Sequence, residues 1–248
     1  MLIVLPPSET KAAGGTRGPL DLTRLAFPEL TATRAELIEE LSALDVPTGL
    51  SVLGLSERMA GEVAANQRLT SAPTMPAIER YTGVLFDALA ALDLPAQARA
   101  RLGVSSALFG LLGAEDLIPH YRLSAGTKLN GATLKSRWGK QITQALSSVE
   151  GLVVDLRSGA YQALGRFAPA VTVRVETAEG KVVSHFNKKY KGQLARILAL
   201  SSDEPDDAAG VARIARAGGL DARVSEPRVP RRASARSLEQ GGEVILTV

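Results

Sequence analysis

Three cationic side chains and one glycine are spaced so that a helix would gather them on one face. At about 100° per residue, a helix starting at Lys188 places these four residues within an arc of roughly 100°: Lys188, Lys189, Gly192 and Arg196. The apolar side chains fall on the opposite side: Tyr190, Leu194, Ile197 and Leu198. A helix start also offers unpaired N–H groups and the positive end of its dipole, so this face could bind an anion. An ordinary solvated basic surface explains the same charges equally well.

Gly192 is the residue that departs most from an ordinary helix face. Glycine in a helix interior costs up to about 1 kcal/mol relative to alanine, and the close approach of a ligand or of another backbone segment would explain its use. Upstream, residues 181–187 alternate with the period of a strand, as do residues 171–176. We therefore predict a hairpin that turns at residues 177–180 and leads into the basic helix.

Two further groups of polar residues follow apolar runs that are typical of buried strands. The run 1–5 leads into Ser8, Glu9, Thr10 and Lys11, and the run 152–156 leads into Arg157, Ser158 and Tyr161, where Ser158 could cap a short helix. In open α/β sheets, ligands bind beyond the carboxyl ends of the strands. If the two strands are neighbours, Ser158 and Tyr161 would face the loop of Lys11.

Permanent charges also occur in the loop-rich stretch before residue 130. Arg122 and Lys128 are candidates for anion contacts there. His120 could act as a general base or a metal ligand, but Asp116 is its only nearby partner at ligand spacing and Pro119 lies between them. We therefore expect His120 to be packed or solvent-facing, and we predict neither a metal site nor a cofactor.

The composition limits the class of protein. A chain of 248 residues with 45% hydrophobic content can bury a large core, and the absence of cysteine excludes disulfides, thiolate metal sites and cysteine nucleophiles. The first five residues lack a basic flank, and no run of 18 apolar residues occurs. We expect a cytoplasmic protein that does not enter membranes.

The net charge of +3 is unevenly distributed. Between residues 211 and 236, seven arginines stand against two carboxylates and give +5, which leaves −2 for the remainder of the chain. This arginine-rich region, within residues 203–240, could follow phosphates or serve as a solubilising surface.

The order of several motifs resembles that of the YaaA-like peroxide-stress proteins along essentially the whole chain. These motifs are MLIVLPPSETK, GVLFDAL, SALFGLLGAEDLIPHYRLSAGTKL, RWGKQIT, LVVDLRSGAY and HFNKKYKGQLAR. The resemblance implies one α/β domain over residues 1–248, with a mixed sheet flanked by helices in a "cantaloupe"-like fold. It also implies a cytoplasmic role in surviving hydrogen peroxide. Double-stranded DNA would be bound in a basic cleft that contains a helix-hairpin-helix-like element.

The resemblance also assigns residues to that cleft. The family's Lys-Lys-x-[Arg/Lys]-Gly signature falls on Lys188, Lys189, Lys191 and Gly192, and its Ser-x-x-Tyr signature falls on Ser158 and Tyr161. The sequence departs from the family pattern at the Ser-Pro-Ala-Lys start, where the lysine is displaced to Lys11, and at Val84, where the family has an aspartate. The region after Asp203 also differs, so this chain represents a divergent branch.

These observations support two main hypotheses. In the first, the protein binds the DNA backbone and reads its shape, with no catalytic activity, since few aromatic residues lie among the lysines. In the second, an enzyme acts on a small phosphorylated or nucleobase-containing substrate, and a set of polar residues converges in the cleft: Ser8, Glu9, Lys11, Asp155, Ser158, Tyr161 and Lys188. A third hypothesis is a protein partner that binds the arginine-rich region.

Overall fold

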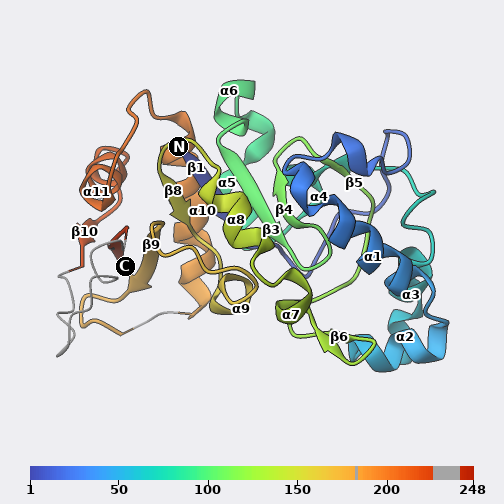
Figure 1. The fold of residues 1–248 in the computed structure, drawn as a ribbon. Helices are drawn as coiled ribbons and strands as arrows, with labels where there is room; N and C mark the ends of the chain where they lie inside the picture. Colours follow the sequence, from blue (N-terminus) through green and yellow to red (C-terminus); the bar gives the residue numbers. More distant parts are fainter. Residues whose placement is uncertain (182–183, 226–240) are drawn as a thin grey trace.

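The amino-terminal apolar run forms a strand near the middle of the main sheet (Figure 1). Strand β1 (Leu2–Leu5) lies between β3 (Leu102–Ser106) and β8 (Val153–Asp155) and is parallel to both. Because both edges are paired and both faces are covered, the strand must be apolar, and it is almost entirely buried. The computed structural model describes residues 1–181, 184–225 and 241–248.

The sheet has seven strands in the order β10-β11-β9-β8-β1-β3-β4. Strand β9 (Val171–Glu176) is parallel to β8 and to β11 (Glu243–Thr247). The two outer strands are antiparallel to their neighbours: β10 (Ala222–Val224) to β11 and β4 (Gly110–Gly113) to β3. The sheet is therefore mixed, as predicted.

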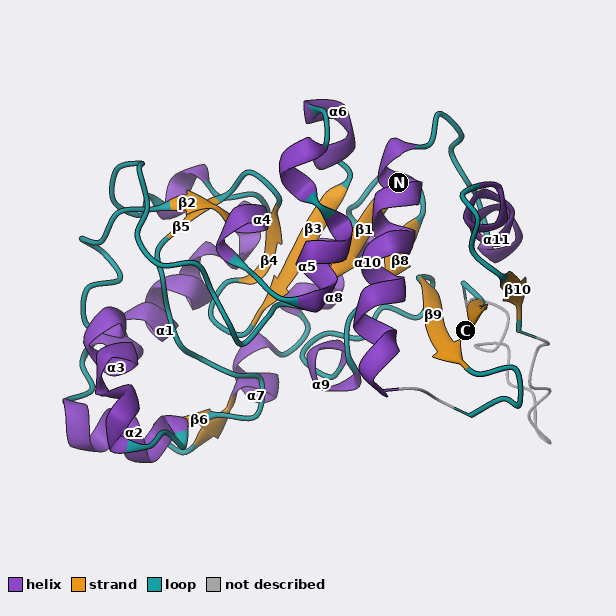
Figure 2. Cartoon of the chain, turned by 180° about the vertical axis from the view of Figure 1, so that it is seen from behind, coloured by secondary structure: helices purple, strands orange, loops and turns teal. Residues whose placement is uncertain are grey.

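Helices cover both faces of this sheet and enclose one hydrophobic core. On the face seen in Figure 2, α5 (Val84–Leu89) packs against α10 (Ser184–Leu200). Helix α8 (Gln141–Ser147) lies on the other face, in front of the sheet in Figure 1, and α11 (Ala208–Ala217) packs beside β10. The predicted architecture, a single α/β domain with a helix-flanked mixed sheet, is confirmed.

The remaining elements build the part of the molecule beyond β4, at the right of Figure 1, and the connections along the sheet. The α-helices are α1 (Thr31–Ser42), α2 (Val46–Leu53), α3 (Ala60–Asn66), α4 (Ala77–Arg80), α6 (Ala96–Arg99), α7 (Leu134–Trp138) and α9 (Gly159–Gln162). Short 3-10 helices occur at Leu22–Arg24, Pro28–Leu30, Glu57–Met59 and Ala91–Asp93. Two small sheets pair β2 (Met75–Pro76) with β5 (Leu117–Ile118), and β6 (Lys128–Leu129) with β7 (Ala132–Thr133).

The predicted hairpin at residues 171–187 is wrong. Strand β9 forms as expected, but both of its edges are occupied by β8 and β11, so no place is left for a strand at residues 181–187. The backbone is helical from Ser184 onward, and residues 182–183 lie outside the described part of the chain. An amphipathic stretch that can cover α5 and the sheet follows the helical period instead.

Candidate functional site

The carboxyl ends of the three central parallel strands meet at one edge of the sheet. Strands β1 and β8 are direct neighbours, with Val4 opposite Asp155, so the predicted adjacency of their following loops is confirmed. Strand β3 ends beside them at Ser106. Loops 8–11 and 157–161 therefore open toward the same side of the molecule.

Backbone pairing holds the loop after β1 against residues 80–82. The Thr82 amide donates to the Thr10 carbonyl at 3.2 Å, and the Ala12 amide donates to the Arg80 carbonyl at 2.8 Å. The buried guanidinium of Arg80 also donates to the carbonyls of Ala12 and Gly14. These contacts give the loop a fixed conformation and set the position of the side chain at residue 11.

Lys11 lies over two aromatic rings. Its Nζ is 4.4 Å from the ring centre of Tyr121 and 5.4 Å from that of Tyr81, and it donates to the Ser8 carbonyl at 3.2 Å. Desolvation lowers the pKa of Lys11 to about 8; the charge of Glu9 opposes this shift and that of Arg122 adds to it. A substantial fraction of this amine is therefore neutral near physiological pH.

The rings beneath Lys11 belong to a buried chain of hydroxyl groups. The hydroxyls of Tyr81 and Tyr121 are 2.7 Å apart, and the Tyr121 hydroxyl is 2.8 Å from Ser106 Oγ. Burial raises the pKa of Tyr81 to about 12 and that of Tyr121 well above its usual range. Both phenols are protonated at neutral pH, as exposed phenols also are, and burial keeps them protonated further into the alkaline range.

Arg122, Glu9 and Tyr161 form the rim of this group. Arg122 Nη2 pairs with Glu9 Oε2 at 2.8 Å, and Arg122 Nη1 donates to the Glu9 carbonyl at 3.1 Å. Tyr161 is half-buried, and burial, followed by the neighbouring Tyr81 and Glu9, raises the pKa of its phenol. We define the Lys11 cluster as the following six residues: Glu9, Lys11, Tyr81, Tyr121, Arg122 and Tyr161.

Ser158 lies on the same edge but outside the cluster. It is exposed at the start of α9, and its side chain makes no capping hydrogen bond. Nearby, Asp155 is buried and holds Arg157 through two hydrogen bonds of 2.8 Å, so this carboxylate serves an internal ion pair. The enzyme hypothesis therefore retains Glu9, Lys11 and Tyr161 as neighbours, but Asp155 is already engaged.

The predicted basic face of α10 is divided between surface and interior. Lys188 and Lys189 are exposed. Lys191 is buried and donates to the Leu156 carbonyl at 3.1 Å, and desolvation lowers the pKa of its amine. Only the first two lysines are thus open to a ligand.

Gly192 and Arg196 serve the packing of α10 against α5. A Cβ at Gly192 would lie 2.2 Å from the carbonyl oxygen of Leu85, so the two backbones approach more closely than any other residue permits. Arg196 Nη1 donates to the carbonyls of Leu89 and Ala90, each at 3.0 Å, and so satisfies the carboxyl end of α5. The interpretation of both residues as anion contacts is therefore not supported. A neighbouring backbone, one of the two explanations considered for the glycine, accounts for it.

Two other predicted features lie outside the Lys11 cluster. Lys128 is exposed on β6, within a small separate sheet near α7 (Figure 1). His120 Nε2 is 3.0 Å from Glu62 Oε2 and borders a cavity of about 560 Å³ lined also by Gly14 and Arg68. Among the described residues, no group of three or more histidines and carboxylates is arranged to hold a metal ion.

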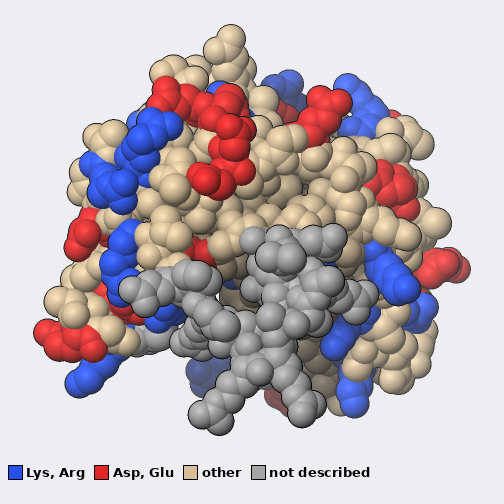
Figure 3. All heavy atoms as spheres, turned by 60° about the vertical axis from the view of Figure 1, so that its left-hand side comes forward, with Lys and Arg blue, Asp and Glu red and all other residues tan. Residues whose placement is uncertain are grey.

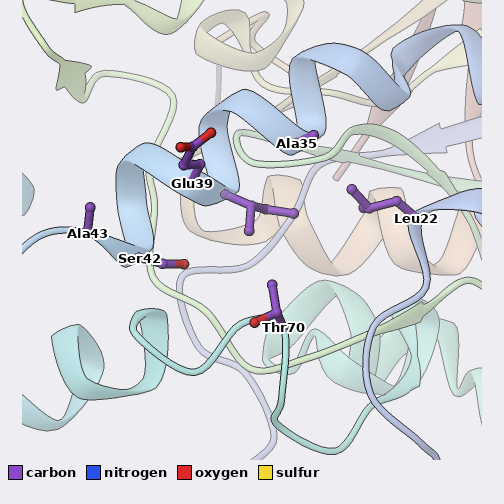
Figure 4. Close-up of a pocket in the computed structure, with 7 residues that line it drawn as sticks. Leu22, Ala35, Glu39, Ser42, Ala43 and Thr70 are labelled. Atoms are coloured by element: carbon purple, nitrogen blue, oxygen red, sulfur yellow. The ribbon is translucent and has the colours of Figure 1, made fainter.

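A second hollow lies along α1 and is shown in Figure 4. Its walls come from Leu22, Thr70, Ile38 and small residues at the carboxyl-terminal part of α1, and Glu39 is the only ionisable side chain among the described residues that line it. Its polar side chains are the Glu39 carboxylate and the hydroxyls of Ser42 and Thr70, and Ser42 Oγ already donates to the Asn66 carbonyl at 3.1 Å, so we do not assign a site there.

The described arginines of the carboxyl-terminal region are already paired. Arg213 contacts Asp203 at 2.6 Å, Arg223 contacts Glu176 at 2.6 Å, and Arg216 donates to the Ala222 carbonyl. Figure 3 shows acidic and basic side chains interspersed on this side of the molecule. The other four arginines of the predicted region lie outside the described residues. In the described part of the chain, no helix is long and apolar enough to span a bilayer.

The sequence alone did not predict that the rings of Tyr81 and Tyr121 lie beneath Lys11. The roles of Tyr81, Arg80 and Ser106 at this site were not predicted from the sequence. A local signal exists two residues after Tyr81. There Gly83, with a φ of 100°, turns the chain into α5 beside Thr10. Periodicity alone could not show that this turn meets the loop after β1.

The fold and the Lys11 cluster define a class: α/β proteins with a mixed sheet and a polar, aromatic-lined site beyond the central parallel strands. The family model described as "Peroxide stress protein YaaA" matches residues 1–217, and the chain belongs to this family. The helix-hairpin-helix-like element is not confirmed, because in the described residues α10 follows strand β9 rather than a helix.

Several bacterial relatives share nearly the whole chain. A UPF0246 protein of Corynebacterium efficiens is 56% identical over 237 residues, which cover 92% of this chain and 97% of the relative. A UPF0246 protein of Corynebacterium glutamicum is 56% identical, with coverage of 89% and 94%. One from Streptomyces coelicolor is 43% identical, with coverage of 92% and 94%. Membership supports a role related to peroxide stress.

Proposed function

We propose that this protein acts in the cytoplasmic response to hydrogen peroxide by binding double-stranded DNA through phosphate contacts. The observation that carries the proposal is the pair Lys188 and Lys189 near the amino end of α10. Both are exposed, and within the described residues neither has an ion-pair partner. When unpaired lysines contact phosphates, they release the counterions condensed on the nucleic acid, and this release favours binding.

The surroundings of these lysines favour recognition of backbone rather than bases. The positive end of the α10 dipole lies beside them, and α9 with the exposed Ser158 is near this end of the helix in Figure 1. Of the aromatic rings of the Lys11 cluster, Tyr81 and Tyr121 are buried and cannot stack on bases. We therefore expect binding that depends strongly on salt and weakly on sequence.

The test compares duplex DNA binding by the wild type and by the double variant Lys188→Ala/Lys189→Ala across a salt series. Loss of two phosphate contacts should weaken binding and reduce the slope of log K against log salt by about 1.8. The matched control is Lys135→Ala/Lys140→Ala, which removes two other exposed lysines and equal charge. Equal slopes for the wild type and the first variant would show that α10 is not part of the DNA interface.

A second candidate function rests on the Lys11 cluster. We propose that it holds a small anionic substrate, which displaces the exposed Glu9 carboxylate from Arg122 and lies beside a partly neutral amine and three phenols. A thermal-shift screen of phosphorylated metabolites tests it. A ligand that stabilises the wild type but not Arg122→Met would support a small-molecule site, and stabilisation of both proteins would place the ligand elsewhere.

A further inference from the structure

In the part of the chain that the structure describes, the Lys11 amine has no carboxylate partner, although a carboxylate is close by in sequence. Within the described residues, Glu9 is paired with Arg122 at 2.8 Å, and the only hydrogen bond of Lys11 Nζ is to the Ser8 carbonyl. The lysine side chain is partly buried, so it keeps an opening to solvent while losing much of its hydration. This arrangement differs from that of a structural lysine in an ion pair.

The groups around Lys11 act in opposite directions on its charge. Desolvation, Arg122 and Arg80 favour the neutral amine, whereas Glu9 and Glu62 favour the ammonium. The faces of Tyr81 and Tyr121 also favour the cation. With a pKa near 8 instead of the ordinary 10.5, the neutral fraction at pH 7 is about two orders of magnitude larger than for an exposed lysine.

We propose that Lys11 is an amine nucleophile that condenses with an aldehyde to form a covalent imine. The neutral Nζ attacks the carbonyl carbon and a C–N bond forms, while the carbonyl oxygen gains a proton. The resulting hydroxyl group then leaves as water with a proton from nitrogen, and a C=N bond remains. Amine and aldehyde give imine and water, so no oxidant or reductant is needed.

The neighbours of Lys11 suit this reaction. The Tyr161 phenol is protonated at neutral pH, as an ordinary phenol also is, and it neighbours Glu9 and Tyr81, so it can supply a proton to the carbonyl oxygen. The Glu9 carboxylate, which pairs with Arg122, offers an acceptor for the proton of the attacking nitrogen. Arg122 adds a binding point for a phosphate attached to the aldehyde. The preferred substrate is therefore an aldehyde that carries a phosphate.

Two sources could supply such an aldehyde: an abasic deoxyribose in duplex DNA and a free sugar phosphate. The experiment incubates the full-length protein at pH 7 with an abasic duplex or with glyceraldehyde 3-phosphate, in the presence of cyanoborohydride, which reduces an imine to a stable amine. Peptide mass mapping then locates the adduct. We expect at least a tenfold higher occupancy at Lys11 than at the exposed Lys135 with one or both probes.

The control variant is Lys11→Arg, which keeps the cation over the tyrosine rings but cannot form an imine. We expect loss of the adduct at residue 11 and an unchanged thermal unfolding midpoint. If the variant does not fold, the adduct occupancy at Lys11 relative to Lys135 in the wild type still tests the proposal. Modification of exposed lysines with Lys11 unmodified by both probes would overturn the proposal.

This inference does not depend on DNA binding, and the same assay separates the two. In the variant Lys188→Ala/Lys189→Ala, the adduct of Lys11 with glyceraldehyde 3-phosphate should still form, whether or not α10 binds DNA in the wild type. A decrease confined to the abasic duplex would support both the DNA interface and the nucleophile. Loss of Lys11 labelling with both probes in this folded variant would contradict an independent role for Lys11.

Discussion

At the scale of single residues, burial shifts the pKa values of one amine and three phenols. Lys11 has its pKa lowered to about 8, and Tyr81 has its pKa raised to about 12. Both shifts have burial as their largest cause, and burial disfavours the charged form of either group. At neutral pH the shift therefore changes the charge of Lys11, of which a larger fraction is neutral than in an exposed lysine, whereas the phenols differ from exposed ones only above about pH 10.

The lowered pKa of Lys11 makes stability depend on pH. Between pH 8 and about 10, unfolded Lys11 still binds its proton while the folded protein has released it, so the free energy of unfolding rises with pH. We expect the difference in unfolding free energy between wild type and Lys11→Met to increase over this window and to be constant below pH 7. Urea denaturation at each pH measures it. A flat difference would show that the amine is hydrated in the folded state.

The phenols lead to a second expectation. Three of the four tyrosines have raised pKa values, so spectrophotometric titration of the folded protein should show most phenols still protonated at pH 10.5. In urea all four should titrate near pH 10. Stability should accordingly fall above pH 10, because the unfolded chain then binds fewer protons. Tyr121→Phe should remove one late-titrating group, and an unchanged titration curve would argue against the buried hydroxyl chain.

At the scale of elements, α10 shows why a charge pattern is an incomplete guide to a binding face. Lys188 and Gly192 share one side of the helical wheel, yet the first is exposed and the second touches α5. The wheel gives directions relative to the helix axis, but a second helix packed on that side cannot be read from it. The helix itself was predicted correctly from Lys188 onward, and its first turn was mistaken for a strand.

Substitution at Gly192 tests the packing role. We expect Gly192→Ala to destabilise the protein by about 1–3 kcal/mol or more, because the new Cβ would clash with the Leu85 carbonyl. Gly61→Ala in α3 is the matched control, since nothing lies within 4 Å of its Cβ and the helix should gain up to about 1 kcal/mol. Urea unfolding compares the two. Equal effects would mean that α10 and α5 are farther apart than described.

The strands show where sequence reasoning succeeded. The alternation at Val171, Val173 and Val175 and the apolar run of β1 predicted both strands. The order of strand and polar loop predicted that Tyr161 faces the loop of residues 8–11, where Glu9 is its neighbour. The partner of β9 could not be predicted, because β11 lies almost 70 residues further along and nothing local specifies its register. Likewise, the Lys11 cluster depends on Arg80 and Ser106, which only the folded chain brings to it.

At the scale of the whole molecule, the sheet is completed by a late segment. Strand β11 enters between β9 and β10, and its Val244 and Leu246 are fully buried in the common core. Burial on this scale links the carboxyl-terminal strand to the stability of the entire domain.

A core substitution in β11 checks this link. We expect Leu246→Ala to lower the free energy of unfolding by about 2–5 kcal/mol, as for other fully buried leucines. Thr247→Ala, at a partly exposed neighbouring position, should change it by less than about 1 kcal/mol. A small effect of Leu246→Ala on urea unfolding would mean that the domain is stable without this strand.

The central position of β1 limits the rate of folding. Ile3 pairs with Leu102 on one side and with Val154 on the other. The backbone hydrogen bonds on each edge of this strand therefore form only after a segment far away in the sequence has reached it. Closing such large loops costs chain entropy before any contact compensates it, which makes refolding slow. Until then Leu2–Leu5 presents an unprotected apolar edge, and dilution or chaperones should decide how much of the refolding protein escapes aggregation.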